Sequence, residues 1–410
     1  MADFIMNHRK IGLFVFVRKM AFTLLVLAAA VSVCMAFRNG LEEFDFQWDP
    51  AKLLMMGDNP YAYSLEHKPV THPGFMTPEI AANQLPSCLL LLAPWTVFPQ
   101  LTANRIWDAC NILFTIVLLF LVYRLFFRDD SVIRGKFLWF ALLFLAGAPW
   151  YILISNGQHL LFSLAFFMGA YYLAVGNKDG VVGECFSGVL LALSAFKYTT
   201  IAPLACIFIA NRWWKPVIVA VFLHVVATVW CGLHLGESPF ALVVQSLKVG
   251  SALTGADGVD VASIVHLYYP DVNVSVWANI GYAIYGVLLV CTVAMRNVDN
   301  LLRLSTLAVI ANLMFYHRVY DFVTLAFPLV YAMKNSRQFG RIDIAIRVAA
   351  CLNVGWTFFL ARAVYRLGVG HSTISFILQV ILLFAFLCKA GMLRDENEGA
   401  FLKTGETNEQ

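Results

Sequence analysis

Long apolar stretches recur along the chain at a spacing of about 20 residues, and this constrains the fold more than any other feature. An apolar α-helix of that length spans the hydrocarbon core of a bilayer, because it satisfies its own backbone hydrogen bonds. The composition agrees, since 60% of the 410 residues are hydrophobic and only 13% are charged. Soluble domains are about half apolar and about a quarter charged. The pattern excludes a soluble enzyme and predicts an all-α polytopic membrane protein.

About twelve stretches are predicted to cross the membrane. The first runs from Met20 to Phe37 behind a basic segment, and it is longer than a typical signal-peptide core, so we expect an uncleaved helix. Residues 84–99 are also apolar, but three prolines interrupt them, which favours a re-entrant or surface helix. The other predicted spans are 104–127, 137–155, 159–176, 181–196, 199–211, 216–235, 274–295, 303–316, 321–333, 343–361 and 373–391.

The positions of lysine and arginine predict the orientation, because short cytoplasmic loops carry more of both. With the N-terminus inside, most of these residues fall on the cytoplasmic side, including those of the basic loop 124–136. A full crossing by 84–99 would move this loop outside, so we reject it. We therefore expect an integral protein of the plasma (inner) membrane with both termini cytoplasmic.

The chain is predicted to form one membrane domain, residues 1–395, followed by a polar, disordered cytoplasmic tail, 396–410. Two external loops are long: 38–103, which we expect to contain short helices, and 236–273. Neither a phosphate-binding glycine loop nor a dinucleotide fingerprint is present. The net charge of +4 is too small to indicate a nucleic-acid partner. An enzyme of this kind must take an activated group from elsewhere, and a lipid-linked donor is the obvious source in a bilayer.

Polar and ionisable residues gather in four segments that the predicted orientation places outside. Such residues are costly at membrane depth and usually functional, so their convergence predicts one site on the external face. The candidates are Asp45 and Asp49 in the first loop, Gln158 and His159 between the third and fourth spans, Lys197 between the fifth and sixth, and His317, Arg318, Tyr320 and Asp321 between the ninth and tenth.

The residue types indicate group transfer from a phosphate to an alcohol. A carboxylate at Asp45, beside Phe44, Phe46 and Trp48, has the apolar surroundings that suit a general base. The cations near the other turns suit a phosphate, and arginine offers two parallel hydrogen bonds. The nine cysteines are scattered singly without a CxxC motif, so no metal site is expected.

Each candidate also has a structural explanation. Asp45 is compatible with a helix cap or a solvated loop charge, and Asp49, directly before Pro50, is typical of an N-cap. Lys197 is compatible with snorkelling to the membrane interface. Arg318 and Asp321 are spaced for a local ion pair.

Several motifs resemble glycosyltransferase family 87. Asp45-Phe46 and the Gly57 to Tyr61 segment resemble the start of that family's pattern. Further motifs occur in matching order over about residues 40–335, namely Leu89 to Pro94, Trp107, Gly157-Gln158, Ala195-Phe196-Lys197 and Tyr316 to Asp321. Gln47-Trp48-Asp49 departs from the tyrosine-rich stretch of many relatives.

The resemblance implies the GT-C class, a membrane bundle that takes sugars from polyprenyl-phosphate donors on the outer face. It also implies that Asp45 is the catalytic base and that His317 and its neighbours bind the lipid phosphate. We therefore expect an inverting transferase that moves a hexose, with mannose first, to a lipid or glycan hydroxyl without a metal or cofactor. A flippase or transporter of lipid-linked sugars and a polysaccharide polymerase stay open as alternatives.

Overall fold

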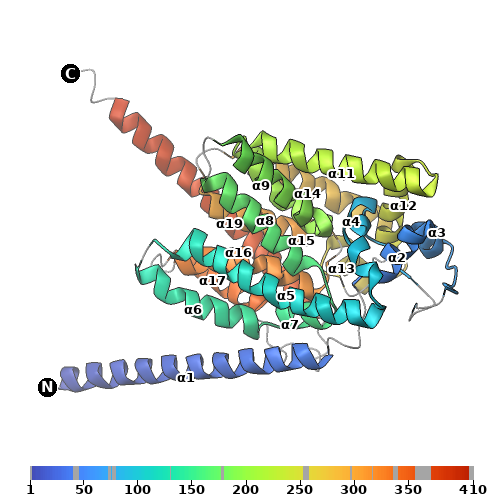
Figure 1. Ribbon diagram of the computed structural model, residues 1–410. Coiled ribbons are helices and arrows are strands. Elements are labelled where there is room, and N and C mark those ends of the chain that lie inside the picture. The colour runs from blue at the N-terminus through green and yellow to red at the C-terminus, as the bar shows by residue number, and fades with distance from the viewer. Residues whose placement is uncertain are drawn as a thin grey trace.

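The computed structural model describes residues 2–39, 46–72, 75, 80–129, 131–176, 180–252, 258–295, 298–315, 317–335, 340–355 and 371–405. Within these ranges the regular structure is entirely helical, as the sequence predicts (Figure 1). Asp45, the predicted base, lies outside the described residues, and so does Tyr316.

Long helices form the body of the molecule, and short helices cover one end of it (Figure 1). The body consists of α1 (Ala2–Asn39), α5 (Gln100–Val122) with the π-helical turn η2 (Tyr123–Phe127), α6 (Ser131–Ala146), α7 (Ala148–Ser155), α8 (Leu160–Gly176), α9 (Val181–Ser194), η3 (Ala195–Lys197), α10 (Tyr198–Ala210), α11 (Trp214–Leu235), α14 (Val274–Ala294), α15 (Asn300–Met314), η4 (Val319–Leu325), α16 (Ala326–Lys334), α17 (Arg341–Val354) and α19 (His371–Gly405). The two predicted external loops contain α2 (Trp48–Met56), α3 (Pro60–Leu65), α4 (Pro86–Leu91), η1 (Ala93–Val97), α12 (Pro239–Ala252) and α13 (Val261–Tyr268).

Six helices of the described part are long and apolar enough to cross a membrane, and the bent pair α6 and α7, with 51° between them, makes up to seven. The membrane class is therefore confirmed, whereas about twelve crossings and the long external loop are not. The helices α8 and α15 are apolar but have only 17 and 15 residues. Helices this short fall below the roughly 20 residues that cross a bilayer unaided.

The chain reverses direction at η3. Glu184 Oε2 and Lys215 Nζ lie 2.5 Å apart at the starts of α9 and α11, and His224 Nε2 donates to the Ala192 carbonyl at 3.0 Å near the end of α9. Because α9 and α11 run side by side in the same direction, α10 must return to the end where α11 begins. By length and composition, residues 181–210 count as one span of 30 residues, but these contacts show the hairpin that the sequence predicts.

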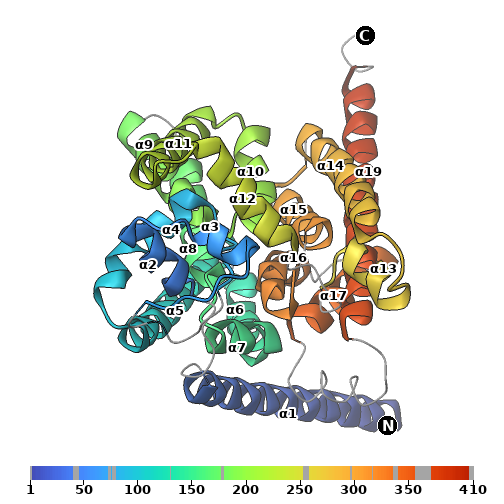
Figure 2. The same cartoon turned by 90° about the vertical axis from the view of Figure 1, so that its right-hand side faces the viewer.

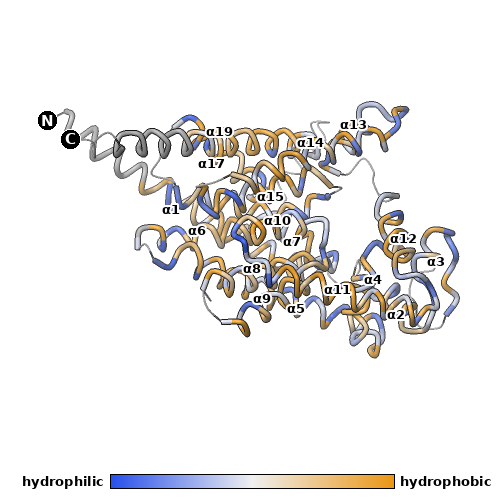
Figure 3. The backbone as a smooth tube through the Cα atoms, turned by 90° about the horizontal axis from the view of Figure 1, so that it is seen from above, coloured by the Kyte–Doolittle hydropathy of each residue, from blue (hydrophilic) through white to orange (hydrophobic). Residues whose placement is uncertain are grey.

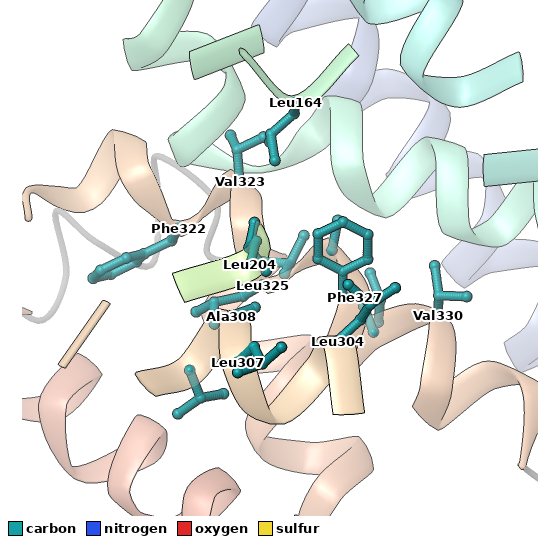
Figure 4. Close-up of a cluster of buried hydrophobic side chains, with 14 of the residues drawn as sticks. Leu164, Leu204, Leu304, Leu307, Ala308, Phe322, Val323, Leu325, Phe327 and Val330 are labelled. Carbon is teal, nitrogen blue, oxygen red and sulfur yellow. The ribbon is translucent and has the colours of Figure 1, made fainter. Parts of the chain in front are cut away.

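Helix α15 lies at the centre of the bundle, with every side chain from Leu301 to Leu313 buried. Its buried hydroxyl and amide side chains find partners within the helix, because Ser305, Thr306 and Asn312 each donate to the carbonyl one turn earlier. Figure 4 shows its Leu304, Leu307 and Ala308 packed against residues of η4 and α16, with Leu204 of α10 beside them. This packing fixes η4, the segment that carries Asp321, against α15, and α7 packs on η4 as well.

Helix α1 lies along the outside of the bundle, where it packs on α6 and α7 (Figure 2). The start of α1 and the end of α19 project from one end of the bundle, and α2, α3 and α12 lie at the opposite end (Figure 1). Apolar residues occupy most of each long helix, as the hydropathy colouring of Figure 3 shows.

Two local expectations are wrong. Asp49 is not the N-cap of α2, because the helix begins at Trp48 and Gln47 precedes it with a left-handed φ of 62°. Instead, the Asp49 carboxylate lies in the first turn and accepts a hydrogen bond from Gln100 Nε2 at 3.0 Å. The tail is also helical to Gly405 rather than disordered from residue 396, because it extends α19, and adding residues to an existing helix avoids the cost of nucleation.

Candidate functional site

A buried cluster of charges forms where η4 meets the η3 turn. Asp321 Oδ2 accepts a hydrogen bond from the Arg318 backbone N–H at 3.1 Å and lies 3.0 Å from His317 Nδ1. Its other oxygen, Oδ1, lies 3.4 Å from Lys197 Nζ. The side chains of His317 and Asp321 are almost fully buried, whereas that of Lys197 is 15% exposed. One carboxylate therefore holds two basic side chains from segments 120 residues apart in the chain.

The 3₁₀ turn η3 brings Lys197 into this cluster. The Lys197 backbone N–H donates to Ser163 Oγ at 3.1 Å, which ties the turn to the start of α8. Its ammonium lies 5.4 Å from the centre of the Tyr320 ring, within the range of a cation–π interaction. The Lys197 side chain therefore points at Asp321 and Tyr320 and does not simply snorkel.

The charge cluster opens on a cavity of about 510 Å³, which is within the size range of small-molecule sites. Two lysines and one carboxylate line it together with four aromatic rings, and side-chain amides and hydroxyls complete the wall. The lining residues are Asn83, Gln84, Lys197, Tyr198, Thr199, Val244, Leu247, Lys248, Gly250, Ser251, Tyr282, Phe315, Tyr320 and Asp321.

Hydrogen bonds hold two walls of this cavity, the segment around Gln84 and helix α12. Burial raises the pKa of the Tyr61 hydroxyl well above its usual value, so this group stays protonated and donates to the Gln84 carbonyl at 2.8 Å. Asn59 caps α3, and its Nδ2 donates to Glu237 Oε1 and to Gln245 Oε1 of α12, each at 2.9 Å. The first loop and α12 are thereby fixed to each other on the cavity's border.

An aromatic cluster connects the first loop to η3. His159 is fully buried, and its ring stacks on Phe196 with 4.2 Å between the centroids. Because a carbonyl oxygen only accepts, His159 Nε2 carries the hydrogen of the 2.9 Å bond to the Phe46 carbonyl. The Phe46 ring stacks on Trp107 at 4.7 Å, and Trp107 Nε1 donates to the Gly157 carbonyl at 2.9 Å. His159 therefore links Phe196, which precedes Lys197, to Phe46, which follows Asp45.

The predicted site residues separate into three groups in the structure. Lys197, Tyr320 and Asp321 line the cavity. His317 lies behind Asp321 and outside the lining, and the exposed Arg318 contributes its backbone N–H to Asp321. Gln158, His159 and Asp49 are buried and are not part of the cavity wall.

Sequence reasoning missed several lining residues, above all Asn83, Gln84, Lys248 and Tyr282. Lys248 could have been included from the sequence, because it is a cation that the predicted orientation places on the external side. The two amides carry no such signal, since polar residues ahead of a proline are ordinary loop residues.

We expect His159→Phe to lower the turnover of this protein about tenfold or more, with little change in the KM of a donor. The phenyl ring keeps the stack on Phe196, but the Phe46 carbonyl loses its donor, and the main chain beside Asp45 is released. The measurement is steady-state kinetics of purified variants. His234→Phe is the matched control, because His234 stacks at 4.9 Å on Trp230, which does not belong to this cluster. Equal losses in both variants would contradict a positioning role.

The comparisons with known proteins bear on the centre of the chain. The family model described as glycosyltransferase family 87 matches residues 86–317, more than half of the 410 residues. This range includes η3 and the His159, Phe196 and Trp107 members of the aromatic cluster, but not Phe46, Asp45 or Asp321. Neither the comparison with curated proteins nor the comparison with solved structures gives a match. On its family match and its apolar helices, the chain belongs to glycosyltransferase family 87 and is a membrane glycosyltransferase.

Proposed function

We propose that this protein transfers a hexose, with mannose as the first choice, from a polyprenyl-phosphate donor to a lipid or glycan hydroxyl with inversion. The observation that carries this proposal is the Lys197–Asp321–His317 cluster on the wall of the 510 Å³ cavity. A cavity bordered by a partly exposed ammonium and several aromatic rings suits a ligand that combines a phosphate with a sugar.

The charges of the cavity suit a phosphodiester. Lys197 and Lys248 line it against the single carboxylate of Asp321, and Asp321 is already engaged by Lys197 and by the Arg318 N–H. An ammonium has three N–H donors, so Lys197 can hold Asp321 and still donate to a phosphate oxygen. Asp321 and His317 act in this proposal as the support that aims Lys197.

The reaction requires one proton acceptor and one stabilised leaving group. The acceptor hydroxyl attacks the anomeric carbon, a new C–O bond forms, and the bond from that carbon to the phosphate oxygen breaks. The proton passes to the Asp45 carboxylate, and the polyprenyl phosphate leaves with one more negative charge. Lys197 stabilises that charge as it develops, and such electrostatic stabilisation is often the largest catalytic contribution.

The position of Phe46 supports Asp45 as the base. Phe46 is fixed by the His159 hydrogen bond and by its stack on Trp107. His159 in turn stacks on Phe196, the residue next to Lys197. Phe46, which follows Asp45, is therefore held in the same cluster as Phe196, which precedes the proposed phosphate ligand Lys197.

We propose that this site faces the extracytoplasmic side. Single cysteines at positions 66, 132 and 400, in a background without the nine native cysteines, test the orientation by labelling with a membrane-impermeant maleimide. The external cysteine is placed at the exposed position 66, because Pro60 of the same loop is buried at the start of α3. We expect position 66 to react from outside, and positions 132 and 400 to react only after permeabilisation, since the basic loops favour the cytoplasm. Labelling of position 132 from outside would overturn this orientation.

The function itself is tested with purified protein in nanodiscs and radiolabelled polyprenyl-phosphate mannose. Release of polyprenyl phosphate together with label in a glycan or lipid product supports the proposal. Movement of intact donor across a vesicle membrane without release of sugar would instead identify a flippase. Growth of an oligosaccharide on its own lipid carrier would identify a polymerase.

A further inference from the structure

A second cavity, of about 220 Å³, lies between α1, α5 and α7 and shares no lining residue with the first. Its walls are apolar except for two charged side chains of α5, Arg105 and Asp108. The other lining residues are Ala36, Ala109, Ile112, Trp150 and Ile154. Neither the family match nor the proposed reaction gives this cavity a role.

The two charged residues are unusual because neither has a partner among the described residues. They are three positions apart on one helix, yet no ion pair or hydrogen bond joins them to each other or to another described side chain. Asp108 belongs to a candidate membrane span and is only partly exposed. An ionisable group in such a segment is costly, so it normally has a functional partner.

The cavity opens toward lipid at the edge of the membrane. Arg105 and Ala109 are exposed, and the same stripe of α5 continues with Leu113 and Ile116, which are 56% and 60% exposed. Asp108 lies 16 residues before Arg124, about 24 Å along the helix. Because the hydrocarbon core is about 30 Å thick, Asp108 lies close to the headgroups of the leaflet opposite to Arg124.

We propose that this cavity binds the headgroup of a phospholipid with a primary ammonium group, such as phosphatidylethanolamine. The lipid-facing opening admits a ligand that is attached to acyl chains. The Arg105 guanidinium matches the phosphodiester, and the Asp108 carboxylate matches a hydrogen-bonding cation. An anionic lipid would bring no partner of opposite charge to Asp108, and a choline group has no N–H to donate and is bulkier.

A bound headgroup would connect α1 to α5. Helix α1 packs on α6 and α7, and its Ala36 lines this cavity together with residues of α5. The segment that follows α1 leads to Phe46, which packs on Trp107, the neighbour of Asp108. The lipid would thereby hold the end of α1 near the first loop.

The test measures lipid retention and is independent of glycosyl transfer. The full-length protein is equilibrated in nanodiscs with equal amounts of phosphatidylethanolamine, phosphatidylcholine and phosphatidylglycerol, then extracted in detergent, and its bound lipids are identified by mass spectrometry. We expect wild-type protein to retain phosphatidylethanolamine about tenfold over the other two lipids. Asp108→Asn should abolish the preference over phosphatidylcholine, and Arg105→Gln should lower the retention of all three.

Two further variants make the result decisive. Ala109→Trp narrows the opening without a change of charge and should reduce retention as much as Asp108→Asn does. Arg124→Gln, in the π-helical turn η2 that continues α5 and outside the cavity, should retain lipid like the wild type. Size-exclusion chromatography confirms that each variant is folded. Equal retention of the three lipids by wild-type protein, or an unchanged preference in folded Asp108→Asn, would overturn the proposal.

Discussion

Asp45→Asn is expected to lower the rate of sugar transfer by about 10²–10⁴, the usual loss when a general base is removed. The amide keeps the size of the side chain but accepts no proton from the acceptor hydroxyl. Donor binding should stay near the wild-type value, because the proposed phosphate ligand is Lys197. The measurement compares single-turnover transfer with the affinity for a non-transferable polyprenyl-phosphate analogue.

Asp49→Asn is the matched control for this prediction. Asp49 is buried and accepts a hydrogen bond from Gln100 Nε2 at 3.0 Å, so its replacement should lower thermal stability more than the rate of transfer. An active Asp45→Asn protein together with an inactive but folded Asp49→Asn protein would move the base to Asp49.

Lys197→Met is expected to lower kcat/KM for the donor by about 10²–10³, because it removes the cation that stabilises the leaving phosphate. The same change also leaves Asp321 without its lysine, and breaking a buried ion pair typically costs about 3–5 kcal/mol of stability. Stability and activity must therefore be separated. The measurements are donor kinetics, analogue affinity and thermal unfolding of each purified variant.

The double variant Lys197→Met/Asp321→Asn separates the two effects. Without either charge, most of the lost stability should return, while the donor kinetics should stay as poor as in Lys197→Met. Arg318→Met is the matched control, because the Arg318 side chain is exposed and does not line the cavity. Recovery of activity in the double variant would show that Lys197 is only a structural partner of Asp321.

Local sequence patterns determined the helices of this protein and the turns between them. Apolar runs predicted the all-α membrane class, and their interruptions predicted the short helices of residues 84–99, observed as α4 and η1. The hairpin around Lys197 followed from the same local signals. These features depend on backbone hydrogen bonds, prolines and helix-capping residues within a few positions of one another. Such local information can be read directly from the sequence.

Only the tertiary structure decided which side chains meet. The rotation of each helix about its axis brings Lys197 to Asp321, buries His159 against Phe46, and leaves the Arg318 side chain exposed although it lies three residues from Asp321. It also places Asp108 in a second cavity, although in the sequence Asp108 is only a single carboxylate in an apolar run. Such contacts depend on packing between segments far apart in the chain. The hydrophobic periodicity of one segment does not show where another segment will pack.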